Sequence, residues 1–322
     1  MKAVHILVTG GAGFIGANLV EALLKDERVG LVRVIDDLST GSISNLEPLL
    51  SNPKLEFVEA DICDYDNCLR ALEGIDLISH QAALGSVPRS IQNPLKTNEV
   101  NINGTLNVFT AAREAGIRRV VYAASSSTYG DSPNLPKRED IIGNPLSPYA
   151  VTKLVNELYA RVYAQLFDME FIGLRYFNVF GPKQNPEGAY AAVIPLFVKA
   201  MLTGESPTIH GDGLQSRDFT YVANAVQANF LALFTENREA INQVYNIAVG
   251  DQTTLIELFE KLRDISGASI EAIHGPTRTG DVRHSMADIS KARELLGYEP
   301  EFDIDRGLEE AFRWYSQAQI FQ

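Results

Sequence analysis

The sequence Val4-His-Ile-Leu-Val-Thr-Gly-Gly-Ala-Gly-Phe-Ile-Gly16 indicates the fold, because an apolar run leads directly into a glycine-rich turn. Gly10, Gly13 and Gly16 have the spacing that allows a tight turn and a close approach of the backbone to a pyrophosphate. The residues from Ile15 onward have a helical pattern, and the first turn of such a helix offers amide donors to an anion. We therefore expect a strand, a phosphate-binding loop and a helix, in this order.

Strands and helices alternate through the first half of the chain. Short β-branched runs, typical of strands, are separated by longer stretches with helical periodicity. Because these runs are apolar throughout, they predict a parallel sheet that is covered by helices on both faces. The expected strands are Val4–Val8, Leu31–Ile35, Leu55–Glu59, Leu77–Ser79, Val120–Ala124 and Phe171–Tyr176, and the expected helices are Ile15–Leu24, Cys68–Leu72, Glu99–Ala115 and Pro148–Phe167.

The second half of the chain has a different residue pattern. Proline and glycine recur in it, as in Gly181-Pro182 and Gly211-Asp212-Gly213, and predict shorter elements. Val244–Ala248 has the composition of a strand that returns to the main sheet. We expect a doubly wound α/β fold of the Rossmann type over residues 1–177, interleaved with a smaller substrate-binding lobe over residues 178–322 and with the active cleft between them.

Composition limits the classes of function. The chain has 322 residues, of which 45% are hydrophobic and 21% charged, as in ordinary globular proteins. Its formal net charge of −13 disfavours a nucleic-acid partner. The two cysteines, Cys63 and Cys68, and the scattered histidines predict no metal site. Neither a leader sequence nor an apolar run near the ~20 residues of a membrane span is evident, so we expect a soluble cytoplasmic protein.

An acidic residue accompanies the glycine loop. Asp36 ends the second expected strand, 20 residues beyond Gly16, where a carboxylate binds the ribose hydroxyls of a dinucleotide. This carboxylate favours NAD, because it would repel the 2′-phosphate of NADP, and Arg33 lies within the strand. Asp61-Ile62 and Ala82-Ala83 follow the third and fourth strands, where adenine and pyrophosphate would lie.

A tyrosine and a lysine form the second chemical signal. If Pro148 starts a helix, Tyr149 and Lys153 share one face of it. The ammonium would lower the pKa of the phenol and make it a base. Ser125, at the end of an earlier strand, could hold a substrate hydroxyl beside Tyr149 and relay its proton. Alone, these features could be an exposed helical pair and a turn, but together with the glycine loop they favour a catalytic site.

With these motifs, the sequence resembles the extended short-chain dehydrogenases/reductases over nearly its whole length. It is most similar to the UDP-sugar 4-epimerases, in particular to the bacterial branch that acts on UDP-N-acetylglucosamine and UDP-N-acetylgalactosamine. The segments that carry the resemblance are Thr9–Gly16, His80–Ser90, Asn101–Thr105, Ser125–Gly130, Tyr149–Lys153, Arg175–Pro182 and Arg278–Asp281.

The resemblance implies a bound NAD that is reduced and reoxidised within one turnover, with Tyr149 taking the proton of the C4 hydroxyl. The 4-keto sugar turns over while its diphosphate stays anchored. The implied cofactor contacts are Gly10, Gly13, Phe14, Ile15, Gly16, Asp36, Asp37, Asp61, Ile62, Gln81, Ala82, Ala83, Asn101, Tyr149, Lys153 and Tyr176. The implied substrate contacts are Gly85, Ser86, Ser125, Ser126, Ser127, Asn178, Ala192, Val193, Ile209, His210, Arg217, Arg278, Asp281 and Ser285, with Arg217 and Arg278 as diphosphate clamps.

The resemblance also bears on the sugar and on assembly. Epimerases confined to plain sugars often carry a tyrosine at the place of Ser285, so this small residue predicts room for an N-acetyl group, with Gly85, Ala192 and Ser126 nearby. The helices at 99–115 and 148–167 are where relatives pair into a homodimer through a four-helix bundle. His80 is interpreted as structural.

Three alternatives stay open. The 4,6-dehydratases carry a carboxylate at the strand end where this chain has Ser125-Ser126-Ser127, which disfavours dehydration. Arg89 could bind a sugar carboxylate, as in a UDP-glucuronate-type epimerase or decarboxylase. A non-catalytic NAD-binding protein could share the fold, although such proteins typically lose the tyrosine or the lysine.

Overall fold

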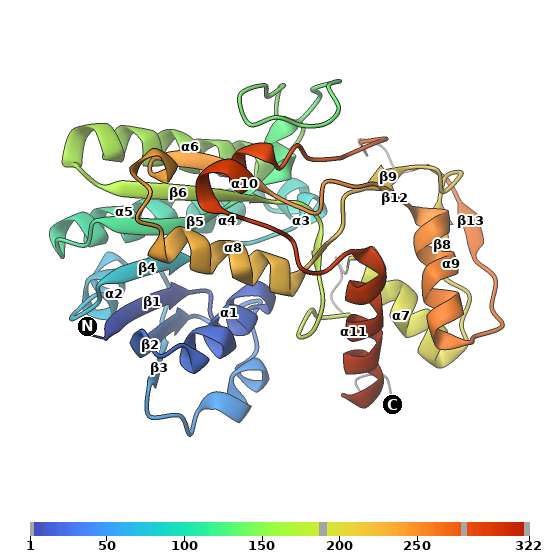
Figure 1. The fold of residues 1–322 in the computed structure, drawn as a ribbon, viewed down its shortest axis with the longest axis horizontal. Coiled ribbons are helices and arrows are strands. Elements are labelled where there is room, and N and C mark those ends of the chain that lie inside the picture. The colour runs from blue at the N-terminus through green and yellow to red at the C-terminus, as the bar shows by residue number, and fades with distance from the viewer. Residues whose placement is uncertain (1–2, 187–191, 278–281, 319–322) are drawn as a thin grey trace.

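The computed structural model of the chain describes residues 3–186, 192–277 and 282–318. Its centre is a sheet of seven strands in the order β11-β6-β5-β4-β1-β2-β3 (Figure 1). All neighbouring strands are parallel, which confirms the predicted doubly wound α/β fold. The strands are β1 (Val4–Thr9), β2 (Val29–Asp36), β3 (Leu55–Glu59), β4 (Leu77–His80), β5 (Arg119–Ser125), β6 (Glu170–Tyr176) and β11 (Gln243–Ile247).

Helices cover both faces of this sheet, as its apolar strands require. Successive strand residues enter opposite cores: Val8 and Ile172 belong to one, and Leu7 and Phe171 to the other. All four side chains are at most 2% exposed. The first core is covered by α1 (Phe14–Lys25), α8 (Val222–Phe234) and α10 (Ser290–Leu296), and the second by α2 (Tyr65–Ala71), α5 (Thr105–Glu114) and α6 (Pro148–Phe167).

The helical stretch predicted over residues 99–115 is found, but its first six residues, Glu99–Gly104, form a π-helical turn before α5 begins. Within this turn Asn101 is fully buried and binds the main chain of Leu84 through both ends of its amide. Gly104 packs so closely that a Cβ there would lie 2.8 Å from a neighbouring side chain. These tertiary contacts leave no trace in the helical periodicity of the sequence.

Another predicted boundary also shifts. The helix expected at Cys68–Leu72 begins earlier, at Tyr65, because the Asp64 carboxylate accepts hydrogen bonds from the main-chain amides of Asp66 and Asn67. The short helices between the larger elements are η1 (Ile43–Asn45), η2 (Glu47–Leu49), α3 (Val87–Gln92), α4 (Pro94–Asn98), η4 (Ser126–Tyr129) and η5 (Arg238–Ala240).

The C-terminal lobe has its own core, which includes Phe197, Leu258 and Leu308. Its helices are α7 (Val193–Thr203), α9 (Leu255–Ser266) and α11 (Ile304–Gln317), each longer than the short elements that the sequence led us to expect. Small two-stranded sheets complete the lobe: β7 (Val179–Phe180) with β10 (Thr220–Tyr221), β8 (Thr208–His210) with β13 (Ile273–Gly275), and β9 (Ser216–Arg217) with β12 (Thr253–Thr254).

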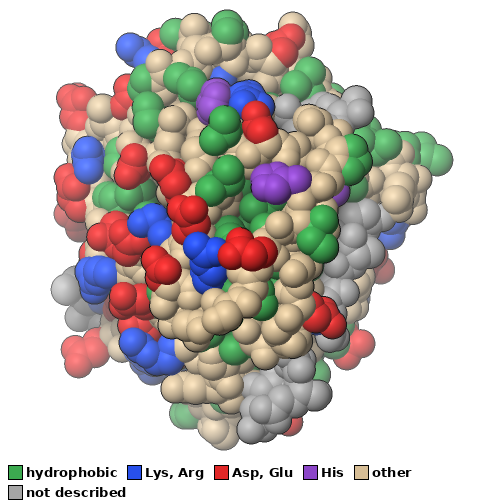
Figure 2. All heavy atoms as spheres, turned by 90° about the vertical axis from the view of Figure 1, so that its right-hand side faces the viewer, with side chains coloured by type: hydrophobic (Ala, Val, Ile, Leu, Met, Phe, Trp, Pro, Cys, Tyr) green, Lys and Arg blue, Asp and Glu red, His purple; other side chains and the backbone are tan. Residues whose placement is uncertain are grey.

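The lobe and the large domain are interleaved along the chain. Strand β11, expected at 244–248, pairs with β6 at the edge of the sheet, while α8 and α10 pack on the sheet's face. The division at residue 177 itself stays a prediction. Figure 2 shows acidic and basic side chains interspersed on the face of the C-terminal lobe. Within the described ranges, no helix is both long and apolar enough to cross a bilayer.

Candidate active site

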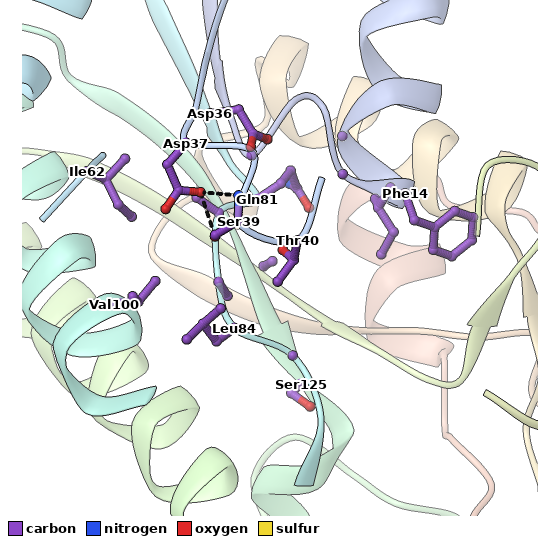
Figure 3. A pocket seen from close by; sticks show the side chains of 18 of the residues that line it. Phe14, Asp36, Asp37, Ser39, Thr40, Ile62, Gln81, Leu84, Val100 and Ser125 are labelled. Atoms are coloured by element: carbon purple, nitrogen blue, oxygen red, sulfur yellow. Dashed lines mark hydrogen bonds between the residues drawn. The ribbon is translucent and has the colours of Figure 1, made fainter. Parts of the chain in front are cut away.

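A cavity of about 430 Å³ opens at the carboxyl ends of the central strands. Figure 3 shows Asp36 and Asp37 at one end of it and Ser125 at the other, with Leu84 between them. Eighteen of the residues singled out from the sequence line this cavity: Gly10, Gly13, Phe14, Ile15, Gly16, Asp36, Asp37, Asp61, Ile62, Gln81, Ala82, Ala83, Gly85, Ser125, Tyr149, Lys153, Tyr176 and Asn178.

The glycine loop is shaped so that two of its glycines admit no other residue. Gly10 has a φ of +67°, and a Cβ there would lie 2.6 Å from the main-chain nitrogen of Ala82. At Gly16 a Cβ would lie 2.1 Å from the carbonyl oxygen of Gly10. Helix α1 starts directly after the loop, with neither an acidic side chain in its first turn nor a side-chain cap on Gly13. The helix N-terminus therefore faces the cavity in a form suited to an anion.

The end of β2 presents a buried carboxylate. Asp36 is 8% exposed and accepts hydrogen bonds from the amides of Ala12 (2.9 Å) and Leu38 (2.9 Å), which tie the glycine loop to the strand. Burial raises the pKa of this carboxyl group. Arg33 binds Glu56 and main-chain carbonyls beyond the sheet, so it lies away from the cavity as expected.

Tyr149 and Lys153 lie on one face of α6, which Ser147 caps through a hydrogen bond from the Ala150 amide. The ammonium of Lys153 donates to the carbonyl oxygen of Ala123 at 2.9 Å. Burial lowers the pKa of Lys153 to about 8. Burial also raises the pKa of the Tyr149 phenol, although a hydrogen bond with Ser125 lowers it in part.

The pKa of Tyr149 thus departs from the sequence prediction, in which Lys153 was expected to lower it below its ordinary value. Lys153 is buried and Tyr149 is partly buried, and burial penalises the charged form of each. Ser125 is the group that lowers the pKa of the phenol, and it is itself bound by the Ser127 hydroxyl at 2.9 Å. The hydroxyls of Tyr149, Ser125 and Ser127 therefore form a connected chain.

A second polar network supports the cavity wall from α8. Asn229 donates to the Tyr176 hydroxyl at 2.7 Å, and that hydroxyl donates to Gln81 at 3.1 Å. A role for Asn229 was not predicted from the sequence. The only feature of the sequence that could have indicated one is the presence of a polar amide in a largely apolar helix. Ser39, Thr40 and Val100, which line the cavity, were not predicted either; the first two follow Asp36-Asp37 in the loop after β2.

Two polar residues from the motifs lie behind the cavity wall. Asn101, expected among the cofactor contacts, holds Leu84 instead, and its amide donates to Thr152. His80 is bound on both ring nitrogens, by Thr9 at 2.7 Å and by Thr105 at 2.9 Å. Burial lowers its pKa to about 3, so this imidazole is neutral.

The expected nucleotide contacts gather in the C-terminal lobe. Asn178 lines the cavity, and its amide donates to the carbonyl oxygen of Asp218. Arg217 and Ser285 come together because the Ser285 amide donates to the carbonyl of Ser216. Arg278 and Asp281 lie outside the described residues. The other expected substrate residues that are described lie outside the lining of this cavity: Ser86, Ser126, Ser127, Ala192, Val193, Ile209, His210, Arg217 and Ser285.

Among the described residues, no group of three or more His, Cys, Asp or Glu side chains could hold a metal ion. Cys63 and Cys68 are free thiols. Burial raises the pKa of each to about 12, which favours the protonated thiol at neutral pH.

Comparison with known proteins identifies relatives across the chain. A model of the NAD dependent epimerase/dehydratase family matches residues 6–248. A putative UDP-glucose 4-epimerase of Methanocaldococcus jannaschii is 40% identical over 96% of this chain and 97% of its own length.

Solved structures share the whole fold. The UDP-N-acetylglucosamine 4-epimerase of Methanobrevibacter ruminantium, in complex with UDP-N-acetylmuramic acid, has a TM-score of 0.93 and 39% identity and covers 99% of this chain and 100% of its own. The UDP-glucuronic acid 4-epimerase of Bacillus cereus, in complex with UDP-glucuronic acid and NAD, has a TM-score of 0.90 and 34% identity, with 98% and 100% covered. These three relatives are described as 4-epimerases of UDP-sugars, one of them putatively, and they differ in the sugar.

Proposed function

The chain belongs to the NAD-dependent epimerase/dehydratase family, and from this premise we propose that it is a UDP-sugar 4-epimerase that interconverts UDP-N-acetylglucosamine and UDP-N-acetylgalactosamine. The observation that carries the proposal is the placement of Tyr149, Ser125 and Lys153 in one cavity with the glycine loop. A cofactor of the dinucleotide type fits this loop, because a Cβ at Gly10 or Gly16 would clash with the main chain of the tight turn. The N-terminus of α1, which follows the turn, carries no acidic side chain that would repel a pyrophosphate.

The residues divide the chemistry among them. Bound NAD would supply a hydride acceptor and donor in the cavity. Ser125 would hold the C4 hydroxyl of the sugar beside the Tyr149 phenol, which removes the proton. Lys153 carries the positive charge that stabilises the phenolate. Asp36 and the N-terminus of α1 would bind the cofactor's ribose and pyrophosphate.

The N-acetyl preference rests on the space around Gly85. This glycine lines the same cavity as Ser125, and no heavy atom outside its two chain neighbours lies within 4 Å of the position that a Cβ would take. The cavity wall therefore leaves room for a substituent on the sugar. Ser285, in the C-terminal lobe, is a second small residue that the family resemblance assigns to the sugar pocket, although it lies outside the lining of this cavity.

A second candidate is a UDP-glucuronate-type 4-epimerase. Arg89 lines the same cavity and could pair with a sugar carboxylate, and one similar structure acts on UDP-glucuronic acid. Dehydration is less well supported, because the carboxylates of the cavity lining, Asp36, Asp37 and Asp61, follow β2 and β3 and not β5.

The test offers UDP-N-acetylgalactosamine, UDP-galactose and UDP-glucuronate separately to the purified protein, without added NAD, and identifies products by chromatography. We expect the acetylated sugar to be converted fastest, and Tyr149→Phe to convert none of them. Preferential conversion of UDP-glucuronate would favour the second candidate, and conversion of no substrate by protein that contains NAD would refute both.

We further propose that two copies pair through α6. Its outer face carries exposed apolar side chains, Val151, Leu158, Val162 and Leu166, of which Leu166 is 67% exposed. A contiguous apolar helix face of this kind favours a self-complementary helix–helix interface. We expect a dimer in sedimentation velocity and a monomer for the double variant Leu158→Glu/Val162→Glu; a monomeric parent protein would contradict the proposal.

A further inference from the structure

Asp218 is a fully buried carboxylate that the catalytic scheme does not use. It directly follows Arg217 in the C-terminal lobe, between β9 and β10. Its carboxylate accepts three main-chain hydrogen bonds, from Val249 at 3.0 Å, Gly250 at 3.1 Å and Ala287 at 3.1 Å. A buried carboxylate that binds main-chain amides from two separate segments fixes the distance between these segments.

The first of these segments belongs to the central sheet. Val249 and Gly250 form the turn after β11, which pairs with β6 along its whole length. This turn is therefore a fixed point relative to the cofactor side of the cavity. The turn contains none of the substrate contacts that the family resemblance implies. Its hydrogen bonds to Asp218 therefore attach Asp218 to the central sheet without involving the substrate directly.

The segment of Ala287, and the loop of Asn178 that binds the main chain of Asp218, lie next to or contain expected nucleotide contacts. Ala287 lies two residues after Ser285, in the segment between residue 282 and the start of α10. The carbonyl oxygen of Asp218 accepts a hydrogen bond at 3.2 Å from Asn178, which lines the cavity with a φ of +33°. Asn178 in turn accepts from the Thr220 amide at 3.3 Å.

We propose that Asp218 is a positioning residue for the nucleotide end of the substrate, since it holds Arg217, Asn178 and the Ser285 segment at fixed places relative to the sheet. The proposal rests on the proposed function, because it takes the ligand to be a nucleoside diphosphate sugar. We expect such a positioning residue to affect the binding of substrate and not the chemical step, because the reacting groups Tyr149 and Lys153 lie on another element, α6.

The test is the variant Asp218→Asn, which keeps the size of the side chain but replaces one acceptor oxygen with an NH₂ group that faces main-chain donors. We expect the KM for UDP-N-acetylgalactosamine to rise roughly tenfold, and kcat per bound NAD to stay within about twofold. A purely structural role would instead reduce the fraction of active protein at an unchanged KM. Asp251→Asn is the matched control, because it removes an exposed carboxylate from the same turn; we expect it to leave both constants unchanged.

Binding of UDP, measured by calorimetry, separates this proposal from the epimerase activity. If the parent protein converts a UDP-sugar but Asp218→Asn binds UDP as tightly as the parent, the positioning role is refuted and the activity stands. If no offered sugar is converted but Asp218→Asn weakens UDP binding, the activity fails and the positioning role stands. A parent protein that does not bind UDP would refute both.

Hydrogen exchange on the parent protein covers the case in which Asp218→Asn does not fold. We expect added UDP to slow amide exchange in the turn at Val249-Gly250, although this turn carries none of the implied substrate contacts. If UDP slowed exchange near Ser285 but left exchange at Val249-Gly250 unchanged, its effect would be limited to the segment that it contacts. This result would overturn the proposal.

Discussion

At the scale of single residues, burial decides the protonation of the reacting pair. Burial raises the pKa of Tyr149 and lowers that of Lys153 to about 8, so the first proton lost from these two groups leaves near pH 8. Once this proton is lost, a fixed share of the protein has a phenolate beside an ammonium. We therefore expect kcat/KM to rise with pH up to about 8 and then to level off.

Two variants check this assignment in initial-rate measurements across pH. Ser125→Ala removes the hydrogen bond that lowers the pKa of Tyr149, so it should reduce the plateau by about 10²-fold or more without moving the midpoint. Lys153→Met should abolish the rise near pH 8. A rise near pH 8 that persists in Lys153→Met would assign the titration to another group.

Side-chain volume is the second residue-scale effect. A tyrosine in place of Ser285 would occupy the space that we assign to the N-acetyl group. We expect Ser285→Tyr to abolish turnover of UDP-N-acetylgalactosamine and to spare UDP-galactose, as measured by the ratio of kcat/KM for the two substrates. An unchanged ratio would remove Ser285 from the sugar pocket. Ser266→Tyr, a substitution at the C-terminal end of α9, is a control for nonspecific effects of the added ring.

At the scale of elements, a buried ion pair fixes the catalytic helix to the sheet. Arg175 on β6 donates to Glu157 on α6 at 2.9 and 2.7 Å, and both side chains are at most 6% exposed. Removing one partner leaves a buried charge unpaired, so Glu157→Gln should lower the free energy of unfolding by about 3–5 kcal/mol in chemical denaturation.

An exposed pair supplies the comparison. Glu310 binds Arg313 on α11 at 2.8 Å, with both side chains more than 40% exposed. Its replacement, Glu310→Gln, should change the free energy of unfolding by less than about 1 kcal/mol. Similar losses for the two variants would mean that the buried pair contributes no more than a surface pair.

The same scale shows which elements can be predicted from sequence. Helix α6 has the predicted bounds, because Ser147 and Pro148 mark its start and Asp168 ends it in the left-handed conformation. Strands were found within one or two residues at each end from their β-branched runs. The helices of the C-terminal lobe were underestimated, because the prolines and glycines counted as breaks lie in the loops between them.

At the scale of the whole molecule, the predictable part of the site is the part that the sheet assembles. Parallel strands bring Gly10, Asp36, Ala82 and Ser125 to one edge of the sheet, independently of the loop conformations. The order of the strands along the chain is therefore sufficient to predict this part of the site. The nucleotide contacts depend on how the second lobe packs. Asn229 and Asp218 show the limit of sequence prediction, since the hydrogen-bond partners that explain each side chain lie far away in sequence.

The central claim is that epimerisation at C4 proceeds by removal and return of the same hydrogen on a cofactor that stays bound. Its most direct test uses UDP-N-acetylgalactosamine deuterated at C4, in ordinary water without added NAD, with the product analysed by mass spectrometry and NMR. The account predicts UDP-N-acetylglucosamine that retains deuterium at C4. Loss of the label to solvent, in a product that is epimerised at C4, would contradict it.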